Sequence, residues 1–348
     1  MDDLEVKAPA NIKIGGEHSV VYGGPSLSAA IALFATARIS ETDNEKLEIV
    51  LQDLKLSISV DEATLRKLYK EYGSRNTADP DSIAKYIANN EDNVEREMLP
   101  YATIAARLLC EQGIAPTGKK IVIHSDVPFQ KGYASSAVCS AAFTMALVKA
   151  SGKKLDDNTA IDIIRDGERV VHRAETAGRI DVGPIYFGGF AKFTSSGGII
   201  KENISIPANF VVIDTGPKPP TAEMVRRVRD LYDSDTKGTT EILKEIDNCV
   251  EKGTDALRRG DLRGLGKQMS RNQELLAELG VSSLGIDTAV AIAEANGAYG
   301  AKLCGGGGGG MAVALVGSAY EANRVIGALK SEGFSAYSAG ITFKGAKD

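Results

Sequence analysis

The sequence contains six consecutive glycines, Gly305 to Gly310, directly after Ala301-Lys302-Leu303-Cys304 and directly before the apolar segment 311–316. Glycine loses more conformational entropy on folding than any other residue, so such a run indicates positions that require a positive φ angle or a close approach of the backbone. A flexible linker would not be flanked so tightly by strand-like sequence on both sides. The segment therefore predicts two strands joined by a glycine loop at a binding site.

The rest of the second half favours a small sheet covered by helices. Further strands are expected over residues 210–214 and 335–341. Apolar residues at helical spacing predict amphipathic helices over residues 222–232, 239–259, 261–279, 283–295 and 319–332. This order of elements indicates an α+β domain of the ferredoxin-like type.

The first half of the chain begins with strand-like sequence. Strands are expected over residues 4–13, 26–40 and 119–125, with two more within 47–60. The pattern predicts helices over residues 101–112, 137–150 and 157–176, a helix-prone stretch over 61–89, and a turn followed by a strand over 182–193. A strand, a glycine-containing loop at 126–136 and a helix then follow one another, which is an arrangement that offers backbone N–H groups to a phosphate.

Length and composition indicate two packed domains of a globular protein. The chain has 348 residues, more than the roughly 250 to 300 at which a single core stops growing. The polar stretch 194–198 is the expected boundary, which gives domains 1–196 and 197–348. Hydrophobic residues at 43% and charged residues at 25% argue against disorder.

The net charge, the lengths of apolar runs and the cysteine spacing argue against several classes of protein. A formal charge of -5 disfavours a nucleic-acid partner, because such binding needs a concentrated basic surface. No apolar run approaches the roughly 18 residues of a membrane-spanning helix. The acidic first residues lack the pattern of a signal peptide, and the four scattered cysteines read as reduced thiols, so we expect a cytoplasmic protein.

Two other segments carry chemistry. The first runs from Ala8-Pro9-Ala10-Asn11 to Gly23-Gly24, and the second contains Gly132 and the pair Ser135-Ser136 before a helix. The serine pair fits either a phosphate-binding loop with a hydroxyl ligand for Mg²⁺ or a plain helix N-cap. The second segment is neither a Walker A loop nor a G-x-G-x-x-G dinucleotide fingerprint.

Together the three segments resemble the three motifs of the GHMP kinases, and within them those of the mevalonate kinase subfamily. The matching stretches are 16–23, 128–137 and 302–311, and the segments 214–221 and 272–281 are also similar to that subfamily. The resemblance covers nearly the whole chain. It implies an N-terminal domain like domain 2 of ribosomal protein S5, a C-terminal ferredoxin-like domain, and a homodimer.

The resemblance also implies a site that uses ATP and Mg²⁺. Counting back from Phe187-Gly188-Gly189 identifies Asp181 as the acid beside the attacking hydroxyl and Glu168, with Ser136, as a metal ligand. The residues implied to hold the nucleotide are Pro128, Lys131, Gly132, Tyr133, Ala134, Ser135, Ser136, Gly307 and Gly308. Those implied to contact the substrate are Asn11, Glu17, His18, Arg179 and Thr215, and for His18 a purely structural role is the alternative.

The match departs from the family pattern beside the reacting hydroxyl. The lysine that follows Ala-Pro-Gly in the family is Asn11 here, and Gly178-Arg179-Ile180 stands where a Ser-Pro is expected. Tyr133-Ala134 likewise replaces Leu-Gly in the second motif. Residues two apart in a strand share a face, so Lys13 is the first candidate to supply the missing ammonium, and Arg179 is the second.

These features predict ATP-dependent phosphorylation of a small alcohol, with mevalonate favoured. One alternative is a GHMP kinase for another alcohol, a sugar or a phosphorylated intermediate. A second is a decarboxylase similar to that of mevalonate diphosphate, whose first motif also has Asn after Ala-Pro-x; the absence of its Tyr-Trp-Gly-Lys segment, in a chain without Trp, counts against it. The third is a nucleotide-binding sensor without turnover, against which the presence of Glu168 and Asp181 argues.

Overall fold

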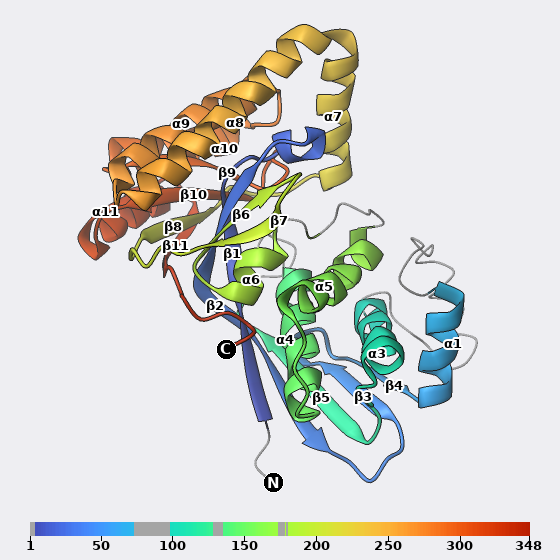
Figure 1. Ribbon diagram of the computed structural model, residues 1–348. Coiled ribbons are helices and arrows are strands. Elements are labelled where there is room, and N and C mark those ends of the chain that lie inside the picture. Colours follow the sequence, from blue (N-terminus) through green and yellow to red (C-terminus); the bar gives the residue numbers. More distant parts are fainter. Residues whose placement is uncertain (1–3, 73–97, 128–134, 173–177, 179) are drawn as a thin grey trace.

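The structure is a computed structural model that describes residues 4–72, 98–127, 135–172, 178 and 180–348, with the side chains of residues 71, 72 and 172 left aside. Two sheets, each covered by helices, make up the described part (Figure 1). Among the described residues, no helix is long and apolar enough to cross a membrane.

The first sheet is built around one long strand. Its strands are β1 (Leu4–Gly15), β2 (Ser26–Glu41), β3 (Leu47–Leu51), β4 (Leu56–Val60), β5 (Lys119–Ser125), β6 (Phe190–Thr194) and β7 (Gly198–Glu202). Their order is β4-β3-β5-β2-β6-β7, and β1 pairs with β2 along nearly its whole length. Only the β3–β5 pair is parallel among the described strands. Because β2 bonds β1, β5 and β6, it joins the two ends of this sheet.

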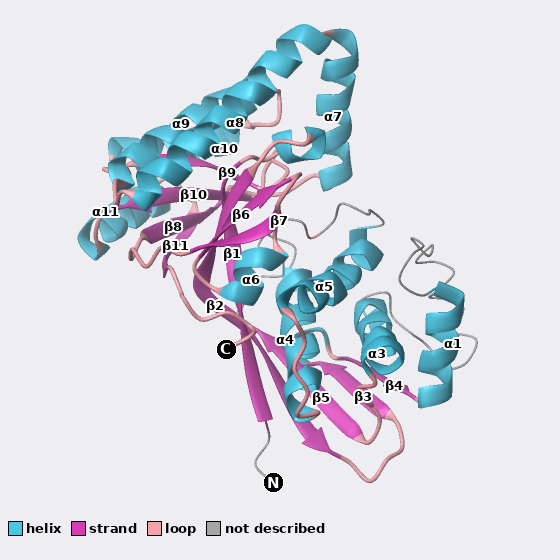
Figure 2. Cartoon of the chain, viewed as in Figure 1, coloured by secondary structure: helices cyan, strands magenta, loops and turns pink. Residues whose placement is uncertain are grey.

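Helices cover one face of this sheet (Figure 2). They are α1 (Glu62–Tyr72), α3 (Leu99–Gln112), α4 (Ser135–Ala150), α5 (Asp157–His172) and α6 (Val182–Phe187). The central helix, α4, is apolar on all sides, as expected of a helix enclosed by other elements. It begins at Ser135, so the serine pair belongs to its first turn rather than to the preceding loop.

One predicted element differs from the structure. Residues 182–193 were expected to form a turn and a strand, but α6 occupies the first part and β6 begins only at Phe190. Four of its six residues, Val182, Ile185, Tyr186 and Phe187, are strand formers by propensity, and all six are buried, so packing against the sheet overrides that local preference. Pro184 is tolerated in the first turn, where its missing N–H would have no helical partner. As a result Asp181 lies directly before a helix.

The second sheet confirms the ferredoxin-like expectation. Its strands β8 (Asn209–Asp214), β9 (Gly300–Cys304), β10 (Met311–Val316) and β11 (Ser335–Gly340) are antiparallel in the order β11-β8-β10-β9. That is the strand order of a β-α-β-β-α-β unit. Its helices are α7 (Thr221–Ser234), α8 (Thr236–Arg258), α9 (Leu262–Glu278), α10 (Leu284–Ala295) and α11 (Ala319–Ser331).

The chain changes from one sheet to the other beyond the expected boundary. Residues 194–198 make the tight turn between β6 and β7, which pair with each other, so the passage to the second sheet follows Glu202. After β11 the chain returns to the first sheet, where the N–H of Thr342 donates to Ala30 O at 3.1 Å and that of Ala346 donates to Ile185 O at 2.9 Å. The two sheets are therefore tied together at both ends of the second one.

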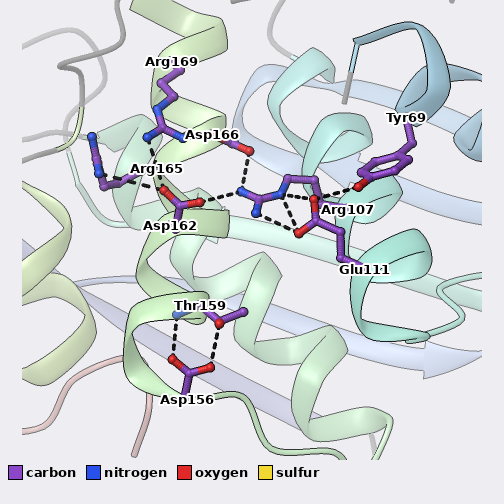
Figure 3. Close-up of polar contacts among 9 residues, drawn as sticks. All are labelled: Tyr69, Arg107, Glu111, Asp156, Thr159, Asp162, Arg165, Asp166 and Arg169. Atoms are coloured by element: carbon purple, nitrogen blue, oxygen red, sulfur yellow. Dashed lines mark hydrogen bonds and ion pairs between the residues drawn. The ribbon is translucent and has the colours of Figure 1, made fainter. Parts of the chain in front are cut away.

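A charged network joins α3 to α5 (Figure 3). Arg107 of α3 donates to Glu111 at 2.8 Å and to Asp162 at 3.1 Å, and it also binds Asp166, which pairs in turn with Arg169. The side chains of Arg107 and Asp166 are 8% and 10% exposed, so solvent screens this contact little. The network fixes α5 against α3 two residues before Glu168.

We expect Arg107→Met to lower the free energy of unfolding by about 3 kcal/mol, because a buried carboxylate that loses its cation is strongly destabilising. Urea unfolding followed by circular dichroism measures the change. The control is Arg271→Met on α9, where the ion pairs are exposed and the cost should stay within about 0.5 kcal/mol. Equal losses in the two variants would show that the network does not stabilise the fold.

Candidate active site

Two polar side chains of β1 meet at a carboxylate that lies far from them in the sequence. Asn11 donates from Nδ2 to Oδ1 of Asp181 at 3.2 Å, and the Lys13 ammonium forms an ion pair with the same oxygen. Strand β1 pairs regularly with β2 between residues 10 and 13, so Asn11 and Lys13 share a face, as the sequence predicted. Ser28, opposite Lys13 on β2, donates to Ile180 O at 3.0 Å and holds the residue next to Asp181.

Lys13 is a buried cation. Its side chain is 8% exposed, and burial by itself would lower its pKa. The charge of Asp181, its hydrogen bond and the other anionic groups nearby together outweigh that effect and raise the pKa above the ordinary lysine value, so Lys13 remains an ammonium. The neighbouring Cys304 Sγ accepts from the Lys13 N–H at 3.1 Å, and burial raises the pKa of that thiol, which leaves it neutral.

A second buried ion pair lies just beyond the first. Glu17, which follows β1, pairs with Lys302 of β9, and their side chains are 2% and 0% exposed. The Lys302 ammonium also donates to Leu303 O at 2.5 Å, and the Leu303 N–H donates to Gln273 Oε1 at 2.8 Å. The first and third sequence motifs are therefore joined by charge as well as by packing.

His18 makes a further link to the glycine loop. Its Nε2 lies 3.0 Å from Gly306 O, so this nitrogen carries the proton and donates. Burial lowers the pKa of His18, more than its hydrogen bond to Gly306 raises it, and the imidazole is neutral at pH 7. The residue has a φ of 62°, which is uncommon for a side chain other than glycine.

The glycine loop is shaped by protein contacts. A Cβ on Gly307 would lie 2.1 Å from Val281 O, and one on Gly309 would lie 2.0 Å from Pro217 O. Both residues have positive φ angles, 83° and 145°. The expected close approach and positive φ are thus confirmed, and the neighbours that impose them are the segments after β8 and α9. Thr215 donates to Gly310 O from both its N–H, at 2.8 Å, and its Oγ1, at 3.2 Å.

Helix packing places Glu168 beside the contact between α5 and α4. A Cβ on Gly167 would lie 2.7 Å from Ser140 Oγ, so α5 crosses α4 in close contact there. Glu168 is next in sequence and is 1% exposed, while Ser136 lies one helical turn before Ser140 on the same face. A carboxylate and a hydroxyl suit Mg²⁺, which takes few protein oxygens and completes its shell with phosphate and water. The described residues contain no group of three or more His, Cys, Asp or Glu side chains that could hold a metal on their own.

Several expected site residues lie outside the described part of the chain: Pro128, Lys131, Gly132, Tyr133, Ala134 and Arg179. Of the expected nucleotide-binding residues, Ser135, Ser136, Gly307 and Gly308 are described. Gly308 is also enclosed by protein, since its Cβ would lie 2.5 Å from Pro219.

Two residues at the site were not predicted from the sequence. Asn272 of α9 is buried and accepts from the Gly16 N–H at 3.3 Å, so it secures the turn that precedes Glu17. Lys218 follows β8 and its stem lies against Gly310, and the charges of Lys13 and Asp181 act on its ammonium. Both lie in segments that carry the family resemblance, but a lone lysine or asparagine has no sequence signal of its own.

Comparison with known proteins places the chain among kinases. Residues 100–189 match the GHMP kinases N terminal domain, and residues 254–335 match GHMP kinases C terminal. The mevalonate kinase of Pyrococcus abyssi is 30% identical over 315 residues, which cover 88% of this chain and 87% of that protein. That of Methanocaldococcus jannaschii is 30% identical over 322 residues, covering 91% and 93%.

Solved structures agree with the sequence relatives. A crystal structure of a mevalonate kinase superposes with a TM-score of 0.78 at 26% identity and covers 97% of this chain and 99% of that one. The mevalonate kinase of Methanococcus jannaschii gives a TM-score of 0.77 at 26% identity, covering 98% of each chain.

The buried, neutral His18 predicts a pH dependence of stability. In the unfolded chain its pKa is near the ordinary value of 6.5, and folding lowers it, so the unfolded chain binds more protons below that pH. The free energy of unfolding should therefore fall as the pH drops below about 6.5. Gln in place of His18 can still donate to Gly306 O but does not titrate. Urea unfolding at several pH values between about 5 and 8 gives the free energy of unfolding at each pH. This free energy should depend less steeply on pH in His18→Gln than in the parent. The same dependence in both proteins would contradict the assignment of this effect to His18.

Proposed function

The chain belongs to the GHMP kinase family, and we propose that it uses ATP to phosphorylate the primary hydroxyl of mevalonate. The relatives named above are mevalonate kinases, and their similarity to this chain extends over most of both sequences. The observation that carries the proposal is the meeting of Asn11 and Lys13 at Asp181. This carboxylate, held by two buried donors beside the glycine loop, suits the activation of an alcohol.

The chemistry follows from the charges of these groups. Asp181 orients the hydroxyl and accepts its proton as the oxygen bonds to the γ-phosphorus and ADP leaves. Lys13 cannot accept that proton, because its raised pKa keeps it an ammonium. It stabilises the negative charge that develops on the substrate oxygen, and this charge is greatest in the transition state.

Lys13 takes the place of the absent family lysine. Asn11 carries no charge, so it supports Asp181 only through its hydrogen bond. The two-residue step along β1 keeps Lys13 on the same face, and its contact with Asp181 supports Lys13 over Arg179 as the required cation.

The nucleotide would be held at the start of α4. Its first turn, at Ser135 and Ser136, presents N–H groups and hydroxyls that suit phosphate oxygens. Mg²⁺ bound by Ser136 and Glu168 would neutralise charge on the β and γ phosphates. The homodimer and the cytoplasmic location expected from the sequence also remain proposals.

A coupled assay of ADP release tests the substrate. We expect turnover with mevalonate and little with phosphomevalonate, homoserine or sugars. Turnover with another alcohol and none with mevalonate at millimolar concentration would refute the substrate but keep the kinase class. Release of CO₂ with ADP would support a decarboxylase, and nucleotide binding without turnover would support a sensor.

The role of Lys13 predicts a specific kinetic signature. We expect Lys13→Met to lower kcat by about 10²-fold or more with a smaller change in KM, because the lost interaction strengthens in the transition state. Asp181→Asn should lower kcat by about 10² to 10⁴. Steady-state kinetics on mevalonate measure both.

The matched control is Lys7→Met, which removes an exposed lysine from the same strand and should leave kcat within about twofold. Circular dichroism shows whether each variant is folded. A Lys13→Met enzyme within twofold of the parent, beside an inactive Asp181→Asn enzyme, would exclude Lys13 as the stabilising cation.

A further inference from the structure

Lys218 lies in the segment between β8 and α7, which covers the end of the glycine loop. The Gly310 N–H donates to Gly216 O at 3.1 Å, so this segment is bonded to the loop. A Cβ on Gly310 would lie 3.1 Å from both Cβ and Cδ of Lys218, and the stem of the lysine therefore rests on that glycine. The absence of a side chain at Gly310 gives the Lys218 stem room to lie against the loop.

The environment of Lys218 is electrostatically unusual. Burial is the first cause that lowers the pKa of Lys218, and repulsion from Lys13 is the second, while Cys304 and Asp181 act in the opposite direction. Lys218 is only partly buried, and within the described residues it has no hydrogen-bond or ion-pair partner. Among the described residues its ammonium therefore has no directly bonded counter-charge.

The charges around Lys218 do not balance. Lys13 is neutralised by Asp181, and Lys302 is neutralised by Glu17. The Cys304 thiol is neutral because burial raises its pKa. With Glu168 assigned to the metal, the cation of Lys218 is the charge of the described part of the site that has no protein partner. A partly desolvated cation beside another cation is stabilised by an anion that enters the site.

We infer that Lys218 binds the carboxylate of the acceptor alcohol and so selects an acidic substrate. The inference rests on the proposed function, because it assigns one end of the same substrate. Mevalonate carries its carboxylate at the opposite end of the chain from its primary hydroxyl. With the hydroxyl at Asp181 and Lys13, the carboxylate needs a nearby cation outside that pair, and Lys218 is such a group.

A phosphate of the nucleotide is the other anion to consider for Lys218. The structure favours the carboxylate, because the charged groups that act on Lys218 are Lys13 and Asp181 on the hydroxyl side. Independent measurements of KM for mevalonate and for ATP distinguish which of the two anions Lys218 binds.

The experiment compares the parent with Lys218→Met and Lys218→Arg, using mevalonate and its uncharged primary amide as substrates. We expect Lys218→Met to raise KM for mevalonate by about 10- to 100-fold, the range expected for a lost hydrogen bond to a charged group. Arg in place of Lys218 should restore part of the affinity. KM for the amide should be the same in the parent and in Lys218→Met within about twofold, because the amide carries no charge to pair.

The matched control is Lys237→Met, which removes an exposed lysine from α8. Calorimetric binding of mevalonate in the presence of ADP gives a readout that does not need turnover. A parent enzyme that phosphorylates mevalonate, beside a Lys218→Met enzyme that binds it equally well, would overturn the inference and leave the proposed function standing. An equal loss on mevalonate and the amide, or a rise in KM for ATP alone, would also overturn it. A parent that neither binds nor phosphorylates mevalonate would refute both.

Discussion

The buried ion pair between Glu17 and Lys302 is the contact on which the rest of the site depends. Desolvating two charges costs several kcal/mol per ion, and their attraction offsets this only when the geometry is good. An apolar pair of similar size could hold the two sheets together equally well. The ion pair instead fixes one relative position, because a small displacement would leave a charge buried without a partner. The distance between β1 and β9, and thus between Lys13 and the glycine loop, is set in this way.

The glycine loop shows how a local sequence feature depends on distant segments. Gly307 and Gly309 have no room for a side chain because Val281 and Pro217 approach them from outside the loop. Hydrogen bonds fix the loop further: His18 bonds the carbonyl of Gly306, and Thr215 bonds that of Gly310. The loop is therefore rigid before any ligand arrives, which lowers the entropy that binding must overcome.

Some of this was visible in the sequence, and the reason is physical. Alternation along a strand is a local rule, so Asn11 and Lys13 could be placed on one face before their partner was known. The glycine run likewise indicated close approach, and the order of elements predicted the ferredoxin-like sheet. Asp181, by contrast, was identified only through a family resemblance, because nothing near it in the chain distinguishes it from a turn former.

Other features depend on tertiary contacts that no local pattern encodes. The strand formers of α6 became helical because packing outweighs their propensity. The polar stretch 194–198 was expected to mark the domain boundary, but such sequence is equally suited to the hairpin turn that it forms. The role proposed for Lys218 depends on the fold alone. The fold places its stem against Gly310 and exposes its ammonium to the charges of Lys13 and Asp181.

The long sequence separation of these contacts has a consequence for folding. Lys13 and Asp181 are 168 residues apart, and Glu17 and Lys302 are 285 apart. Closing loops of that length costs chain entropy before the contacts form, so such contacts tend to form slowly. Local hairpins and helices can assemble first, whereas the site requires strands from both sheets. We therefore expect the catalytic centre to be among the last parts to take shape, and a partly folded chain to hold no working fragment of it.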